Sequence, residues 1–330
     1  MSDPHDGYLA VQQSVGLIDR SDCVRLDVTG PDRAKFLHNL TTNEVKRLAD
    51  GAGHEAFVTS PQGKTLGYVT LLACTDRILL RTDPGGLEFV LPHLRKYGVF
   101  DDVALDDVSG LTFELHLAGP RAEELVTRCG GAVPPTELGH ITMTIAGCPV
   151  RIIRESPTGR PGVSLIGDRA DLDSVLAPLR TQGETVGLVA LDALTFDALR
   201  IEAGTPVFGR DLAADNLPQE MNRDARAINF VKGCYLGQET VARLDALGHV
   251  NKLLRGLRCT GPEVPPAGTV LEAGGKIVGV ITSAAFSPGW NAPVALAIVR
   301  TTHAQPGTEV QIGGQPAVVA ELPMLPRVVE

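Results

Sequence analysis

The sequence predicts an α+β fold in which two related strand-and-helix subdomains precede a small all-β domain. One observation is a repeated order of strand, Gly-Pro pair and amphipathic helix in the first half of the chain. Another is a change after about residue 250, where proline and glycine separate short apolar runs, as in a small barrel or sandwich. The length of 330 residues also favours more than one domain.

The repeated units follow from the local pattern of residues. Residues 23–28 alternate between polar and apolar, which is typical of a half-buried strand. The Gly-Pro pair at 30–31 then begins a helix, because proline fits the first helical turn without losing a hydrogen bond. The same order recurs at 111–120, and a third version runs from 163 to 179. We therefore expect α+β subdomains related by duplication.

The segments between these units complete the predicted organisation. Residues 66–73 and 77–82 are expected to form paired strands, and residues 188–201 a helix. A long irregular connection follows at 205–239, and such connections are more often functional than not. We place the two subdomains within residues 1–248, divided near 50 and 150, and the β domain at 249–330.

Composition limits the classes of partner. The formal net charge of −9 argues against broad binding of nucleic acid or of an anionic membrane. No run approaches the roughly 18 apolar residues that span a bilayer. The start of the chain has neither a basic flank nor an apolar core of a signal peptide. We expect a cytoplasmic protein without direct nucleic-acid or membrane partners.

The six cysteines contain no CxxC pair or other metal-ligand spacing. This pattern predicts reduced thiols rather than disulfides or a zinc site, and no tightly held metal.

One of these cysteines stands in an unusual setting, the segment KGCYLGQE at residues 232–239. Lys232 and nearby backbone N–H groups can lower the pKa of the Cys234 thiol from about 8.5, since they favour the thiolate. The glycines allow positive φ or the close approach of a ligand. The segment predicts that Cys234 is a reactive thiol and that Lys232 favours its charged form; the alternative is a cysteine that only packs.

KGCYLGQE resembles the signature of the YgfZ group of folate-binding proteins, whose mitochondrial relatives act in iron–sulfur cluster maturation. GPDRAKFLHNLTTNEV at 30–45 resembles the opening of the glycine-cleavage T-protein superfamily. The resemblance implies a cloverleaf of three domains around a central folate channel. It implies binding of tetrahydrofolate or a derivative and support of iron–sulfur cluster assembly or repair, and through it of cluster enzymes, including tRNA-thiolating ones. The partners would be assembly or client proteins, with Cys234 as a transient iron ligand.

The block RIEAGTP at 200–206 resembles the segment that lines the folate pocket in this superfamily. The resemblance assigns Glu202 to the pterin ring, because a carboxylate accepts two parallel hydrogen bonds from an aminopyrimidine edge. Arg200 would accompany it, with Arg223, Arg226 and Gln238 as further folate-binding residues. The alternative is an ordinary ion pair between Arg200 and Glu202.

The branch of the superfamily decides the chemistry. The aminomethyltransferase carries an aspartate pair after a strand in the first third of its chain. This sequence has SPQGKTLG at 60–67 instead, and Asp101 and Asp102 fall at an expected turn. These departures predict a protein that is not a classical enzyme. The alternative is a tetrahydrofolate-dependent aminomethyltransferase or demethylating one-carbon transferase, and a third possibility is a cysteine-based redox protein without a CxxC partner.

Overall fold

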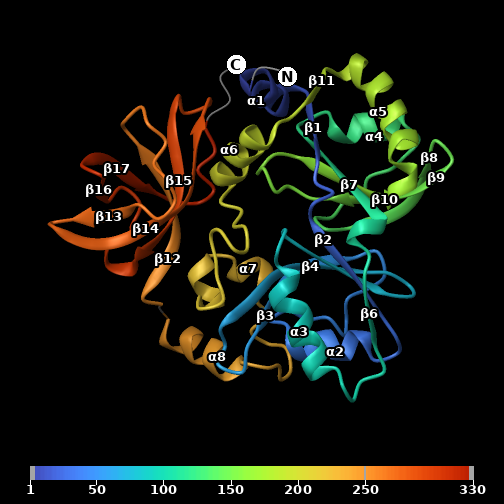
Figure 1. The fold of residues 1–330 in the computed structure, drawn as a ribbon, viewed down its shortest axis with the longest axis horizontal. Helices are drawn as coiled ribbons and strands as arrows, with labels where there is room; N and C mark the ends of the chain where they lie inside the picture. Colours follow the sequence, from blue (N-terminus) through green and yellow to red (C-terminus); the bar gives the residue numbers. More distant parts are fainter. Residues whose placement is uncertain (1–3, 249, 327–330) are drawn as a thin grey trace.

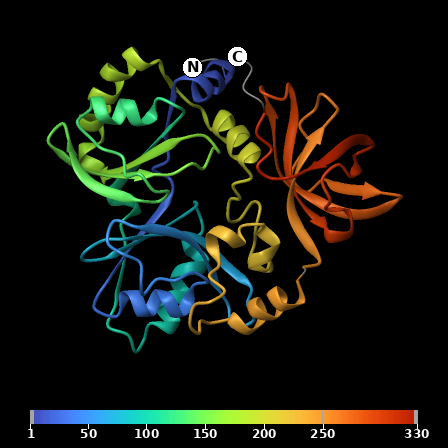
Figure 2. The same ribbon diagram turned by 180° about the vertical axis from the view of Figure 1, so that it is seen from behind.

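Three lobes surround the centre of the molecule in the computed structural model, which describes residues 4–248 and 250–326 (Figure 1). Two lobes consist of a sheet with helices, and the third is a closed barrel formed by the C-terminal strands. Figure 2 shows the same three lobes from behind, with the barrel set apart from the two sheets. The predicted α+β fold with a C-terminal β-barrel is confirmed.

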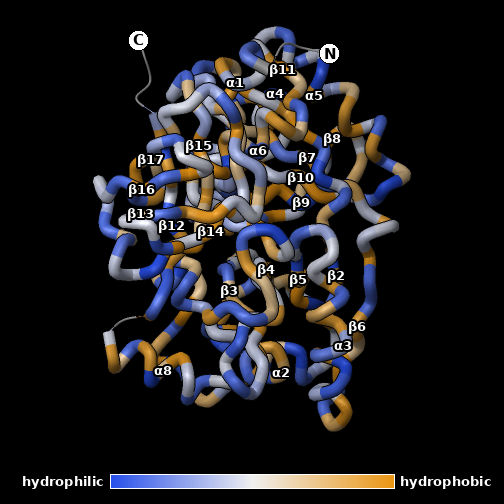
Figure 3. The backbone as a smooth tube through the Cα atoms, turned by 60° about the vertical axis from the view of Figure 1, so that its left-hand side comes forward, coloured by the Kyte–Doolittle hydropathy of each residue, from blue (hydrophilic) through white to orange (hydrophobic). Residues whose placement is uncertain are grey.

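The first lobe contains a five-stranded sheet in the order β3-β4-β5-β2-β6. In that order the strands span Gly53–Thr59, Thr65–Ala73, Ile78–Thr82, Val24–Thr29 and Ala104–Asp107. Helices α2 (Arg33–Leu40) and α3 (Leu87–Tyr97) pack against it through apolar side chains such as Phe36 and Leu94. Beyond α3, a hydrophobic loop reaches the edge of the molecule (Figure 3).

The second lobe contains a six-stranded sheet in the order β11-β1-β7-β10-β9-β8. In that order the strands span Leu188–Ala190, Val15–Asp19, Thr112–Ala118, Gly162–Asp168, Cys148–Arg154 and His140–Ile145. Helices α4 (Ala122–Arg128) and α5 (Leu172–Val186) contribute to the core beside this sheet. β1 pairs in parallel with β11 and antiparallel with β7, so the first strand belongs to the second lobe. The expected divisions near residues 50 and 150 both fall within these lobes.

The two Gly-Pro pairs have a common structural reason. Gly30 has a φ of 98°, and a Cβ there would lie 2.2 Å from the carbonyl oxygen of Asp102. Gly119 has a φ of 127°, and its Cβ would lie 2.5 Å from the carbonyl oxygen of Ser14. Only glycine fits either position, so each pair fixes the turn from a strand into its helix.

Helix α6 (Ala193–Ala203) connects the second lobe to the barrel. It begins where the side chain of Asp192 accepts a hydrogen bond from the Thr195 N–H at 2.7 Å. The predicted helix at 188–201 therefore starts too early, because residues 188–190 join β1 as strand β11. α6 contacts β14, β15 and the first helix, α1 (Pro4–Gln13).

The irregular connection after α6 is fixed against the first lobe. It contains a short 3₁₀ helix (Pro218–Met221), α7 (Asp224–Ala227) and the start of α8 (Gln238–Leu247). The Asn229 N–H donates to the carbonyl of Thr42 at 2.9 Å, and the Leu236 N–H donates to that of Asn39 at 2.8 Å. These bonds hold the connection to the end of α2.

The barrel closes in the order β12-β15-β14-β13-β16-β17. In that order the strands span Lys252–Cys259, Ala292–Arg300, Lys276–Ser287, Val270–Ala273, Glu309–Ile312 and Gln315–Ala320. Closure results because β12 pairs with both β15 and β17. The expected start of this domain at residue 249 lies outside the described residues. Among the helices that the structure describes, none is long and apolar enough to cross a membrane.

Candidate functional site

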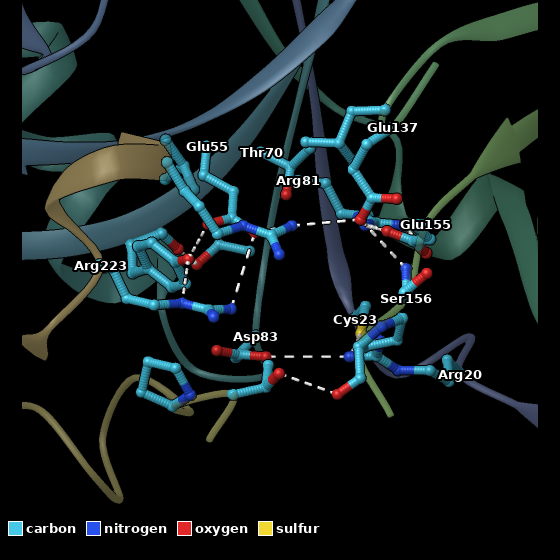
Figure 4. A pocket seen from close by; sticks show the side chains of 18 residues that line it. Arg20, Cys23, Glu55, Thr70, Arg81, Asp83, Glu137, Glu155, Ser156 and Arg223 are labelled. Atoms are coloured by element: carbon cyan, nitrogen blue, oxygen red, sulfur yellow. Dashed lines mark hydrogen bonds and ion pairs between the residues drawn. The ribbon is translucent and has the colours of Figure 1, made fainter. Parts of the chain in front are cut away.

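A pocket opens at the centre of the molecule, where the two sheets meet α7. This central pocket encloses about 610 Å³ of empty space, including its open mouth. Its lining includes four carboxylates and four arginines: Glu55, Asp83, Glu137 and Glu155, with Arg20, Arg81, Arg223 and Arg226. Figure 4 shows Arg223 and Glu55 on one side, Glu137 and Glu155 on the other, and Asp83 facing Arg20.

The inner wall carries a buried ion pair. The Arg81 guanidinium donates to both carboxylate oxygens of Glu155, at 2.9 Å for Oε1, and to Glu114 at 3.1 Å. Ser164 donates a further hydrogen bond to Glu155. Burial disfavours the charged form of Glu155, but the Arg81 guanidinium outweighs this effect and holds the pKa of the carboxyl well below its usual range. The inner wall therefore presents an ionised carboxylate.

Two of the predicted site residues, Arg223 and Arg226, line the mouth of the pocket. Arg226 contacts Glu55 at 2.8 Å and Glu137 at 3.1 Å, and 39% of its side chain is exposed. Arg223 donates from Nε to the Tyr68 hydroxyl at 3.1 Å. The rim of the pocket thus offers a partly exposed guanidinium.

Asp83 follows β5 and differs from the other three carboxylates. Its Oδ2 accepts a hydrogen bond from the Phe208 N–H at 2.9 Å. Its Oδ1 lies 3.8 Å from the Arg20 guanidinium, too far for a hydrogen bond. Arg20 instead donates to the Cys23 sulfur at 3.2 Å.

Glu202 and Arg200 do not line the central pocket. Glu202 is fully buried, and it accepts hydrogen bonds from the Tyr8 hydroxyl at 3.0 and 3.1 Å and from Ser287. Burial raises the pKa of Glu202 to about 7. Arg200 does not pair with Glu202; it contacts Asp197 and Asp211, and it joins α6 to the Ser283 hydroxyl on β14.

The KGCYLGQE segment also lies outside the pocket lining. Cys234 is exposed, whereas the other five cysteines are buried or half-buried. Lys232 is buried, and its three N–H groups donate to the carbonyls of His38, Thr41 and Asn43 at 2.6 to 2.7 Å. Its effect on the Cys234 thiol stays a prediction. Gln238 begins α8, so its folate contact also stays a prediction.

Transient metal binding at Cys234 finds no support from neighbouring ligands. Across residues 4–248 and 250–326, the structure shows no group of three or more His, Cys, Asp or Glu side chains placed to hold a metal ion.

Sequence reasoning missed most of the pocket. The sequence does contain a signal for Arg81, because it is a charged residue inside an apolar strand. A strand that is buried on both faces requires an oppositely charged partner for its arginine. No pattern in the sequence marks Glu155 or Asp83, since each lies in a loop whose position depends on the packing of the lobes.

The comparisons with known proteins agree with this architecture. Residues 5–232 match the GCVT N-terminal domain, and residues 252–325 match the glycine cleavage T-protein C-terminal barrel domain. The chain belongs to the glycine cleavage T-protein family. The superfamily expected from the sequence is thereby confirmed.

Individual relatives of this T-protein family member are similar along most of their length. An aminomethyltransferase of Streptomyces avermitilis is 30% identical over 338 residues, covering 98% of this chain and 89% of the relative. One of Mycobacterium leprae is 30% identical over 92% of this chain and 82% of the relative. The solved aminomethyltransferase T of Bartonella henselae superposes with a TM-score of 0.85 at 21% identity, covering 98% and 89% of the two chains. The names of these relatives support neither the expected assignment to the YgfZ group nor the expectation that the protein is not a classical enzyme.

The chemistry of the central pocket fits the folate that the family implies. A reduced folate has N–H donors on its aminopyrimidine edge and carboxylates on its glutamate tail. An ionised carboxylate such as Glu155 would suit the former, and an exposed guanidinium such as Arg226 would suit the latter. Both groups line the same pocket.

Proposed function

We propose that this protein binds a reduced folate in the central pocket and uses it in one-carbon transfer from an amine, as an aminomethyltransferase does. The proposal rests on the presence of two groups in one pocket. These are an ionised, buried carboxylate on the inner wall and a half-exposed guanidinium at the mouth. When bound, the folate supplies the nitrogen that accepts the carbon unit. The protein's own residues orient it and exclude water.

We assign the pterin edge to Glu155 rather than Glu202. Glu155 lines the central pocket, whereas Glu202 does not line it and accepts its hydrogen bonds from Tyr8 and Ser287. Arg81 fixes the orientation of Glu155 through two parallel hydrogen bonds. Glu202→Gln should then leave folate affinity within about twofold, because no ligand contact is lost. A loss of affinity of more than tenfold in a folded Glu202→Gln protein would restore the role predicted from the resemblance.

The direct test combines binding and transfer. Calorimetry with 5-formyltetrahydrofolate should show stoichiometric binding. Incubation with tetrahydrofolate and an aminomethyl donor, whose carbon is already at the oxidation level of formaldehyde, should form methylene-tetrahydrofolate and release ammonia. Ser156→Tyr places a ring in the pocket and should abolish both, while Thr181→Tyr on the exposed face of α5 is the matched control. Absence of folate binding by the wild-type protein, or full binding by Ser156→Tyr, contradicts the proposal.

A second candidate function rests on the exposure of Cys234. An exposed thiol can exchange with a partner or bind iron transiently, which suits support of iron–sulfur cluster assembly. Cys234→Ser should keep the fold and folate affinity but fail to restore cluster-enzyme activity in a deficient strain. Full rescue by Cys234→Ser would remove this function.

A further inference from the structure

A second pocket adjoins the central one. It encloses about 1210 Å³ including its open mouth, and lies between the end of β1, the start of α6 and the loop at 207–210. Arg20, Cys23 and Asp83 line both pockets. The two cavities therefore meet at these three side chains.

Asp83 is the carboxylate at this junction, and among the described residues no arginine lies within hydrogen-bond distance of it. The other three carboxylates of the central pocket each have an arginine within hydrogen-bond distance, namely Arg226 for Glu55 and Glu137 and Arg81 for Glu155. Among the residues that the structure describes, the Oδ1 of Asp83 has an ion-pair contact only with Arg20, at 3.8 Å, and 16% of the Asp83 side chain is exposed. A carboxylate that is removed from water is stabilised by an N–H donor within hydrogen-bond distance.

The charges around the second pocket favour a cation. Asp197 and the adjacent Asp211 together balance Arg200 and Arg210. This leaves Asp19, Asp22 and Asp83 against Arg20, whose guanidinium is engaged by Cys23 and by the ring of Phe196, 5.0 Å from its centroid. The remaining balance is negative, and opposite charge concentrates cations at such a mouth.

The wall of the second pocket is suited to the carbon part of a small amine. Leu194 lines it with 75% of its surface exposed, and Phe196 and Pro84 also line it. Ligand pockets typically combine apolar walls with a few placed polar or charged groups, and here the charged group is the Asp83 carboxylate.

We propose that the second pocket admits the one-carbon donor as a protonated amine, and that Asp83 holds the ammonium group where the two pockets meet. This inference rests on the proposed function, because it places the donor opposite the folate pocket. Asp83 is a positioning residue, and it supplies from the end of β5 the carboxylate that residues 60–67 lack. The donor and the folate would then approach the junction through different mouths.

The test compares sarcosine with methoxyacetate, which has the same shape but an ether oxygen in place of the protonated nitrogen. Calorimetry is done on the protein saturated with 5-formyltetrahydrofolate. The wild-type protein should bind sarcosine at least tenfold more tightly than methoxyacetate. Asp83→Asn should abolish this preference, and Asp102→Asn, at an exposed turn, is the matched control.

A second variant tests the route. Leu194→Arg adds a cation at the mouth of the second pocket, so sarcosine affinity should fall at least fivefold while 5-formyltetrahydrofolate affinity stays unchanged. Failure of the wild-type protein to bind folate would refute the proposed function itself. Folate binding without a preference for sarcosine, or a preference that survives Asp83→Asn, overturns the amine site. Unchanged sarcosine binding in Leu194→Arg overturns the second mouth as its route.

Discussion

Arg81 on β5 and Glu155, which directly follows β9, form a two-point ion pair that joins the five-stranded sheet to the six-stranded sheet. The pair is buried, with side-chain exposures of 8% and 6%. Its partners lie on different sheets, so it fixes how the two lobes meet at the central pocket. Its loss affects both stability and the shape of the site.

Arg81→Met should lower the free energy of unfolding by about 3–5 kcal/mol, because it leaves Glu155 buried without its cation. Urea unfolding at neutral pH measures the change. The double variant Arg81→Met, Glu155→Leu should recover part of the loss, since it removes the stranded charge. An Arg81→Met protein as stable as the wild type would show that the pair does not hold the lobes together.

The raised pKa of Glu202 predicts that the stability of the protein depends on pH. Its pKa is raised from 4.5 to about 7 in the folded protein, so between these values the unfolded chain releases a proton that the native protein retains. Stability should therefore fall by roughly 3 kcal/mol as the pH rises from about 4.5 to about 7. Glu202→Gln should remove this component of the decline. Parallel pH profiles of the two proteins in urea unfolding would rule it out.

The position of Arg226 at the mouth of the pocket predicts that its contribution to folate affinity depends on the glutamate tail of the ligand. Arg226→Ala should weaken binding of tetrahydrofolate by roughly tenfold to a hundredfold, as expected for a lost charge-assisted hydrogen bond. Binding of tetrahydropteroate, which lacks the glutamate, should change far less. Arg243→Ala on the exposed side of α8 is the control. Equal losses for both ligands would place Arg226 away from the tail.

The hydrogen bonds of Lys232 predict that its substitution changes the stability of the protein rather than its chemistry. Lys232→Met removes the donors for three carbonyl groups at the end of α2 and should cost about 2–4 kcal/mol of stability. Thermal unfolding gives the size of the effect. The reactivity of the Cys234 thiol toward iodoacetamide, compared in the folded wild-type and variant proteins, tests the predicted influence of Lys232 on the thiolate. A stable variant with a much less reactive thiol would favour the chemical role.

Local patterns in the sequence were sufficient for the fold but not for the site. The turns at Gly30 and Gly119 need only neighbouring residues, so the strand-to-helix units were predictable. The central pocket instead combines Arg81, Glu155 and Arg226 from three distant segments. Likewise, the setting of Glu202 depends on Tyr8, 194 residues away, and on Ser287, 85 residues away. Neither partner can be identified without knowing how α1 and the barrel pack on α6.

The position of β1 in the second sheet has a consequence for synthesis of the protein on the ribosome. All strands of the five-stranded sheet have been made once Asp107 is added, so this lobe can form while the chain is still growing. β1 is made before any of them, yet its neighbours β7 and β11 end only at Ala118 and Ala190. The first strand is therefore made well before either of its neighbours in the sheet. A nascent chain stalled before residue 188 would contain every strand of the five-stranded sheet but would lack the edge strand β11 of the six-stranded one.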